Sequence, residues 1–171
     1  QSYAAYANAN YRFWDGFELT GGLRYSYEEK QLDYSMFDPY QIILGFVRDY
    51  RDSRSFHDVS PKVSLSYHFN DKLMAYASYS EGFKSGGWAA DFDTDAQIQS
   101  GLRVNSEFAQ DYEIGVKSTF WDGRARLNLA GFIEKFDQFQ VFQVLQHIVQ
   151  GQNVQETALT NAGKVTSEGV E

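Results

Sequence analysis

Residues 17–28 have the sequence FELTGGLRYSYE, in which side-chain character alternates from one position to the next. The odd positions carry aromatic residues, leucine or glycine, whereas the even positions carry mostly polar or charged residues. Successive side chains of a β-strand point to opposite faces of its sheet, so this alternation predicts a strand with one apolar and one polar face. The run of 12 residues exceeds the usual strand of about five or six residues and covers the roughly 9–11 residues that a tilted strand needs to cross a membrane. The stretch therefore predicts a membrane-spanning β-strand.

The same period of two recurs along the chain. It is clear at residues 59–69, 112–120 and 125–134, weaker at 3–13, and ambiguous at 73–83, where both faces carry aromatic rings. A further strand begins near Thr160, which gives about seven strands. The pattern predicts an all-β protein, an antiparallel segment of a transmembrane β-barrel.

The expected connections alternate in length. Three short turns contain Asp-Gly or Asn-Asp, which favour tight hairpins, and lie at residues 14–16, 70–72 and 121–123. Long polar stretches lie between them at about residues 29–58, 84–106 and 138–160, and we expect the start of the last one to continue the preceding strand. Short turns at one end and long loops at the other are typical of Gram-negative outer-membrane barrels.

The composition agrees with a barrel and excludes several other classes. Mean hydropathy is -0.49, and the longest run without a polar side chain, residues 42–47, is far shorter than the roughly 20 residues of a membrane helix. A barrel strand keeps mean hydropathy low because only every second residue meets lipid. The formal charge of -8 argues against a nucleic-acid partner. Gln1 opens directly into a strand pattern without a signal peptide, so we expect the chain to be a segment of a longer protein.

Aromatic residues gather beside the predicted short turns. Such rings are typical of the girdle that outer-membrane barrels place at the lipid–water interface. The alternative is that aromatic residues simply favour strands and hairpin ends. The residues predicted to form the girdle are Phe13, Trp14, Phe17, Phe69, Phe120 and Trp121.

The sequence predicts neither a metal site nor an enzyme. Residues 91–95 have the D-x-D-x-D start of a calcium loop, but the sixth and twelfth positions are Ala96 and Leu102 instead of the required Gly and Glu. The three histidines are far apart, and cysteine is absent. No nucleophile–base pair, carboxylate pair or phosphate loop stands out. We therefore expect no intrinsic cofactor.

Four segments resemble the barrel of TonB-dependent receptors. They are YASYSEGFKSGGW (76–88), EFAQDYEIGVKS (107–118), FWDGRARLNLAGF (120–132) and NAGKVTSEGVE (161–171), and they occur in the order of that family's strands. The resemblance implies a barrel of about 22 strands, of which residues 1–171 would supply about seven from the middle to the later strands. It also implies a plug domain elsewhere in the same protein, which the periplasmic protein TonB pulls.

The resemblance further implies import of a scarce nutrient across the Gram-negative outer membrane, with a ferric siderophore or a similar metal chelate as the leading small-molecule ligand. The expected ligand-binding residues of the vestibule are Arg48, Arg51, Glu81, Lys84, Trp88 and Arg103. For the arginines of residues 48–54 (RDYRDSR), the alternative is that they pair with Asp49 and Asp52 within the loop. Lumen-facing residues expected to contact the plug are Arg12, Glu18, Arg24, Glu113, Lys117, Arg126 and Glu134. The alternative function is a small eight-stranded outer-membrane barrel with a structural or adhesive role.

Overall fold

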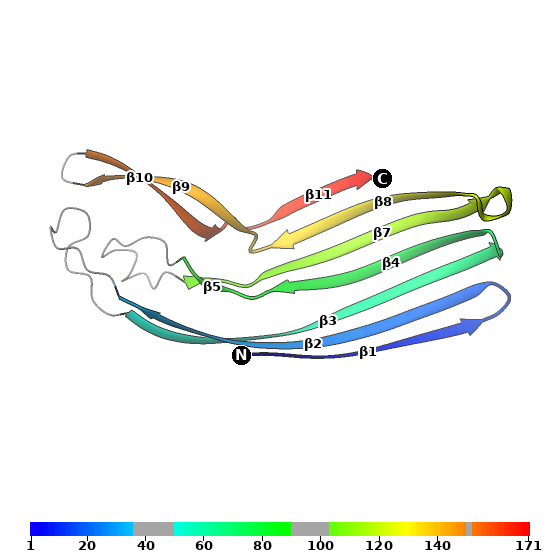
Figure 1. The fold of residues 1–171 in the computed structure, drawn as a ribbon, viewed down its shortest axis with the longest axis horizontal. Helices are drawn as coiled ribbons and strands as arrows, with labels where there is room; N and C mark the ends of the chain where they lie inside the picture. The colour runs from blue at the N-terminus through cyan, green and yellow to red at the C-terminus, as the bar shows by residue number, and fades with distance from the viewer. Residues whose placement is uncertain (36–49, 90–102, 150–151) are drawn as a thin grey trace.

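The computed structural model describes residues 1–35, 50–89, 103–149 and 152–171. Its main element is one antiparallel sheet of seven strands in the order β1-β2-β3-β4-β7-β8-β11 (Figure 1). The strands are β1 (Ser2–Phe13), β2 (Phe17–Tyr34), β3 (Tyr50–Asn70), β4 (Leu73–Lys84), β7 (Glu107–Phe120), β8 (Ala125–Asp137) and β11 (Val165–Val170). Among the described residues, no helix is long and apolar enough to cross a membrane. The predicted all-β, antiparallel architecture is confirmed.

The three predicted short turns lie together at one end of the sheet (Figure 1). Gly16 and Gly123 have φ of 93° and 89°, as tight turns require. Trp14 and Trp121 also have positive φ, at 48° and 49°. In the turns at 14–16 and 121–123 the backbone is therefore left-handed at a tryptophan as well as at glycine, which the sequence pattern did not predict.

At the opposite end the strands run further than predicted. β2 and β3 stay paired as far as Tyr34 and Tyr50, well inside the expected loop at 29–58. A short hairpin, β5 (Gly87–Trp88) and β6 (Arg103–Val104), forms between β4 and β7. In the β2 and β3 extensions the face that is apolar nearer the short turns carries polar residues such as Gln31, Asp33 and Ser53. The apolar half of the alternation therefore disappears where the strands leave the bilayer.

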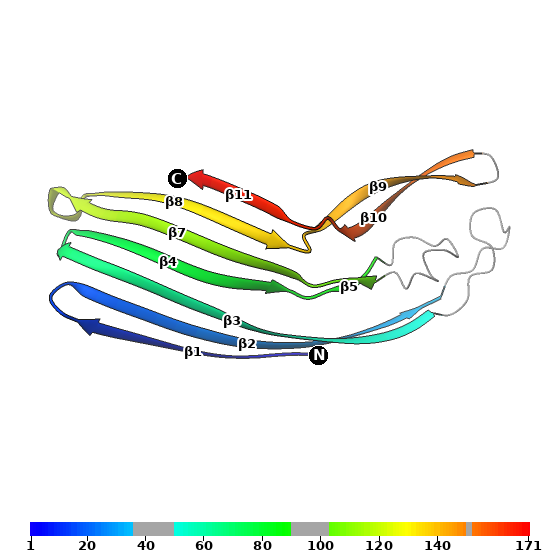
Figure 2. The same ribbon diagram turned by 180° about the vertical axis from the view of Figure 1, so that it is seen from behind.

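The expectation that residues after 138 continue strand β8 was wrong. β8 ends at Asp137, and within the described part of the chain β9 (Gln140–Val149) pairs with β10 (Gln152–Asn161) alone, in a separate two-stranded sheet. Gln138 has φ of 57°, which breaks the extended backbone between the two strands. Both views show this hairpin leaving the line of β8 and β11 at an angle (Figures 1 and 2).

The main sheet is a single layer with two distinct faces. The apolar face carries large side chains that remain open, such as Leu23 at 52%, Ile114 at 68% and Leu129 at 55% exposure. On this face aromatic residues recur eight positions apart, as in Phe17 and Tyr25, which at about 3.3 Å per residue corresponds to roughly 26 Å along the strand. Because barrel strands are tilted by about 35–45°, that length spans about 18–21 Å of height, most of the apolar band of a barrel, which is about 25 Å tall. The apolar face is therefore the lipid-facing surface.

Candidate functional site

The polar face of the sheet meets the β5–β6 hairpin at the loop end of β2 and β3. Glu28, Lys30, Arg54 and Phe56 share this face, because Glu28 pairs with Phe56 and Lys30 with Arg54 in the β2–β3 register. The hairpin base lies across these residues and is held by two groups of contacts. We call them the Asp52 cluster (Asp52, Trp88 and Arg103) and the Arg54 anchor (Lys30, Arg54, Phe56 and Val104).

In the Asp52 cluster, donors from the hairpin converge on one carboxylate from β3. Arg103 donates from Nε to Oδ2 at 3.0 Å and from Nη2 to Oδ1 at 3.2 Å. Trp88 donates from Nε1 to Oδ2 at 2.8 Å, and the hydroxyl of Tyr50 lies 3.4 Å from the same oxygen. The two-pronged arginine contact is the geometry in which guanidinium recognises carboxylate most specifically.

These donors favour the charged form of the carboxyl group. The hydrogen bond from Arg103, followed by that from Trp88, lowers the pKa of Asp52 to about 2, from an ordinary value of 3.8. The same contact raises the pKa of Arg103. Asp52 lies on the β3 extension beyond the lipid-facing band, so the pair is an ion pair throughout the ordinary pH range.

The Arg54 anchor is a small core between β3 and the hairpin. Arg54 Nη1 donates to the carbonyl oxygens of Gly87 at 2.9 Å and Val104 at 2.8 Å, and its guanidinium lies 4.8 Å from the Phe56 ring centroid. Lys30 Nζ donates to Gly86 O at 2.9 Å. Phe56 and Val104 are only 7% and 2% exposed, in a sheet whose side chains are otherwise mostly open. The hairpin base is therefore packed, as well as hydrogen-bonded, against β3.

The other side of the hairpin base is fixed by the base of the β9–β10 hairpin, where Gln140 pairs with Asn161. Asn161 accepts from Asn105 N at 2.8 Å and donates to Asn105 O at 3.1 Å and to Gln138 O at 2.7 Å. Gln140 Nε2 donates to Ser85 O at 3.1 Å and to Asn105 O at 2.9 Å. The side-chain amides of Gln140 and Asn161 thus bind the backbone beside the β5–β6 hairpin and connect two segments that are far apart in the sequence.

The structure brings together two of the predicted vestibule residues, Trp88 and Arg103. Lys84 lies apart from them, with its Nζ 4.0 Å from Glu107 Oε2. Glu81 accepts a hydrogen bond from Tyr79 and lies on the apolar face. Arg51 pairs with Asp33 at 3.1 Å on that same face, away from the Asp52 cluster. Arg48, like the motif at 91–95, lies outside the described residues.

The expected vestibule residues did not include Arg54 or Phe56, and sequence reasoning treated Asp52 only as an internal partner of neighbouring arginines. The structure joins Asp52 to Arg103 instead, 51 positions away. The signal that could have found them is the period of two, which continues through residues 50–58 and separates Asp52, Arg54 and Phe56 from Arg51. The polar composition of the segment hid that pattern.

The residues predicted to face the lumen share the polar face in the observed register. Several form contacts across neighbouring strands. Arg12 pairs with Glu18 at 2.6 Å, Tyr76 donates to Glu113, and Lys117 lies 4.9 Å from the Tyr76 ring centroid. Gly115 makes room for this ring, since an added Cβ would lie 2.6 Å from it.

The residues predicted to form the girdle lie at the turn end of the sheet. Phe13 stacks on Phe17 with ring centroids 5.7 Å apart and contacts Trp14 at 5.3 Å. Tyr67, which the prediction did not include, links Phe17 to Phe69, with centroid distances of 4.6 Å and 4.8 Å. Trp14 and Trp121 are 83% and 79% exposed.

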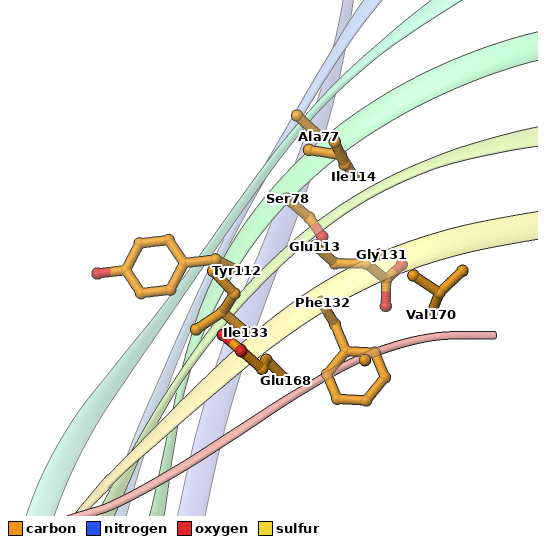
Figure 3. A pocket seen from close by; sticks show the side chains of 11 residues that line it. Ala77, Ser78, Tyr112, Glu113, Ile114, Gly131, Phe132, Ile133, Glu168 and Val170 are labelled. Carbon is orange, nitrogen blue, oxygen red and sulfur yellow. The ribbon is translucent and has the colours of Figure 1, made fainter.

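A hollow of about 730 Å³ is lined by residues of β4, β7, β8 and β11, at the β11 side of the sheet (Figure 3). Its lining includes Ile114 and Val170 of the apolar face and Phe132, whose ring lies over Gly169. The hollow lies at the depth of the lipid-facing band and away from the Asp52 cluster. We therefore assign it no ligand. Among the described residues, no group of three or more His, Cys, Asp or Glu side chains is placed to hold a metal ion.

The fold defines the class of protein, a segment of a membrane β-barrel with a folded-in hairpin at its loop end. The family model described as "TonB dependent receptor-like, beta-barrel" matches residues 1–171, so the chain belongs to the TonB-dependent receptor family and represents part of its barrel. Members of this family are outer-membrane transport receptors of Gram-negative bacteria, and this chain is an outer-membrane protein. The predicted family and location are confirmed.

The chain is similar to named relatives over its full length. It is 26% identical to the ferric-pyoverdine M114 receptor PbuA of Pseudomonas sp. (strain M114), covering 100% of this chain and 18% of that protein. Among solved structures, the ferric yersiniabactin uptake receptor FyuA from Yersinia pestis superposes with a TM-score of 0.71 at 23% identity, covering 99% of this chain and 23% of that one. The hemophore receptor HasR of Serratia marcescens, solved with its hemophore HasA and heme, gives 0.68 at 18% identity, with 99% and 30% covered. The chain thus spans less than a third of each relative.

Proposed function

We propose that this chain is part of the barrel of an energy-coupled receptor that imports an iron chelate, most specifically a ferric siderophore. The family match over residues 1–171 is the observation that carries the proposal. The named relatives receive ferric pyoverdine and ferric yersiniabactin, or heme from a hemophore, so iron in chelated form is what they have in common. The receptor has no intrinsic cofactor in this proposal, and the iron is cargo.

The Asp52 cluster and the Arg54 anchor lie where such a receptor would meet its ligand. Trp88, Arg103 and Arg54 offer cationic and aromatic groups at the loop end of the polar face. Arginine and aromatic rings together suit an anionic chelate, through charge-assisted hydrogen bonds and stacking. We propose Trp88 and Arg103 as vestibule residues, with Lys84 further along the rim.

The polar face below this region would contact the plug domain. Its charged residues already share one face of the sheet. In ion pairs such as Arg12–Glu18 one side chain remains accessible to a binding partner, since Arg12 is 82% exposed whereas Glu18 is 19% exposed. TonB would act on the plug and not on this segment. A catalytic role is not proposed, because the family is one of transport receptors. The alternative of a small structural barrel gains no support from the named relatives, which are all receptors.

Uptake of labelled iron by cells that carry or lack the full-length receptor tests the proposal. Cells are starved of iron and offered ⁵⁵Fe as siderophore chelates or as heme, with and without an active TonB. We expect receptor-dependent and TonB-dependent uptake of at least one siderophore chelate. Uptake that is equal in the two strains for every iron source would refute iron import, and uptake of heme alone would refute the siderophore assignment.

A further inference from the structure

The Asp52 cluster is a complete binding site for one carboxylate, and the protein fills it with its own side chain. Arg103 uses two nitrogens to reach both oxygens of Asp52, and Trp88 adds a third donor. The two donor residues belong to the β5–β6 hairpin, whereas the carboxylate belongs to β3. The side chain of Arg103 can therefore turn away from Asp52 without unfolding either element.

Exposure differs between the two sides of this contact. The side chain of Asp52 is only 13% exposed, whereas that of Arg103 is 56% exposed. The guanidinium thus remains accessible from the solvent side while it holds an enclosed carboxylate. A second carboxylate approaching from solvent reaches Arg103 before it reaches any other member of the cluster.

The hairpin does not depend on Asp52 to remain against β3. Arg54 holds the carbonyl oxygens of Gly87 and Val104, and Lys30 holds that of Gly86. Phe56 of β3 and Val104 of the hairpin are both buried, and the Phe56 ring lies close to Gly86 at the hairpin base. The Asp52 contact is consequently separable from the packing that positions the hairpin.

We infer that Asp52 is an internal surrogate for a carboxylate of the cargo, and that an iron chelate with a free carboxylate group binds by exchanging with Asp52 on Arg103 and Trp88. The inference rests on the proposed function and names the chemical class of its ligand. In this exchange the ligand's carboxylate takes the place of Asp52 on the two donor residues, while Asp52 stays nearby on β3. Asp52 therefore opposes ligand binding both as a competitor for the donors and through its negative charge. Asp52 then sets the affinity, because a ligand binds only to the fraction of receptors in which the donors are free.

The test uses full-length receptor purified in detergent and two ferric probes. Ferric citrate carries free carboxylates, whereas ferrichrome is a neutral trihydroxamate chelate without one. The variant D52N keeps the shape of the side chain and removes its charge. The matched control is D33N, which removes a carboxylate that pairs with Arg51 on the opposite face of the same β2–β3 extension. Dissociation constants are measured by calorimetry for both probes.

We expect D52N to bind ferric citrate about tenfold more tightly than wild type if the donors are free in about a tenth of the molecules. We expect its affinity for ferrichrome, and the affinity of D33N for both probes, to change less than twofold. Adding R103Q to D52N should abolish the gain. Hydrogen exchange of the β5–β6 hairpin, compared between D52N and wild type, shows whether the hairpin stays packed on β3 in the variant.

Three outcomes overturn the inference. Weaker binding of ferric citrate by D52N would mean that Asp52 is a structural latch. An equal gain for both probes, or for D33N, would mean that any loss of negative charge suffices. Binding of iron chelates by wild type without a citrate-specific gain in D52N would remove the surrogate role and leave the proposed function intact. If wild type binds neither these probes nor any siderophore chelate, the proposed function itself fails.

Discussion

Gly86 is the position at which the packing of the hairpin on β3 can be tested most directly. A Cβ added there would lie 2.2 Å from Val104 O, 2.9 Å from Phe56 Cε1 and 3.0 Å from Asn105 C. At the adjacent Gly87 an added Cβ meets nothing within 4 Å. Neither glycine has the left-handed backbone that disfavours alanine. G86A and G87A therefore make the same chemical change at neighbouring positions, and only the first collides with the anchor.

The size of the effect follows from these distances. An ordinary carbon–oxygen contact is about 3.3 Å, so the alanine methyl group must move from Val104 O by about 1 Å. Such a shift lengthens the Arg54 bonds to Gly87 O and Val104 O, now 2.9 Å and 2.8 Å, towards the limit of a hydrogen bond. Overpacking of this kind costs about 1–3 kcal/mol. A loss of about 2 kcal/mol corresponds to a roughly thirtyfold change in a local opening equilibrium.

Hydrogen–deuterium exchange of the full-length receptor measures this opening. We expect peptides covering residues 85–89 and 103–106 to exchange about thirtyfold faster in G86A than in wild type. In G87A the same peptides should exchange within about twofold of wild type. Equal protection in both variants would show that Gly86 does not pack closely against Phe56 and the Val104 carbonyl, and that the Arg54 anchor does not hold the hairpin base on β3.

Three further predictions concern the two faces and the ion pair. In urea unfolding of the receptor in lipid vesicles, I114K should lower stability by about 2–4 kcal/mol, because it places a charge on the lipid-facing surface. The control S78K, on the polar face, should change the urea midpoint little. Equal effects of the two substitutions would contradict the assignment of the faces. G115A should cost about 1–3 kcal/mol in the same assay, since its Cβ would lie 2.6 Å from Tyr76, and Y76A should relieve that cost. Because the pKa of Asp52 is about 2, its contact with Arg103 and Trp88 contributes stability above about pH 4, and this contribution is lost as the pH falls through about 2. The near-ultraviolet circular dichroism of wild type should therefore stay constant from pH 8 to 4 and change near pH 2. A transition of the same size in D52N would show that another group titrates.

The membrane-spanning part of the fold was predictable because its physical constraint is simple. Each strand exposes apolar side chains to lipid on one face only. Apolar and polar residues therefore alternate in stretches such as residues 17–28 and 112–120. The short turns were predictable because left-handed backbone favours Asp-Gly pairs. Trp14 and Trp121 adopt positive φ against the usual preference, and nothing in their local sequence indicated it.

The candidate site was only partly predictable, because its contacts join segments far apart in sequence. Asn161 meets Asn105, and Asp52 meets Trp88 and Arg103, through pairs that no local pattern specifies. The sequence indicated Trp88 and Arg103 by their chemistry and their place beside a loop. It could not indicate the carboxylate that they hold, since that depends on the hairpin folding back across β3.

The β3 extension shows that polar segments beyond the bilayer still obey strand parity. Arg51 and Arg54 stand three positions apart, so they lie on opposite faces, and only Arg54 reaches the hairpin. Asp52 is on the same face as Arg54, which is why it meets Arg103 and not its neighbour Arg51. A one-residue shift in the β2–β3 register would exchange the two faces and place Arg51 in the site instead. The register of the β2–β3 pair therefore decides which residues face the vestibule. That register is set in the membrane-spanning part of the two strands, where the sequence shows the apolar alternation.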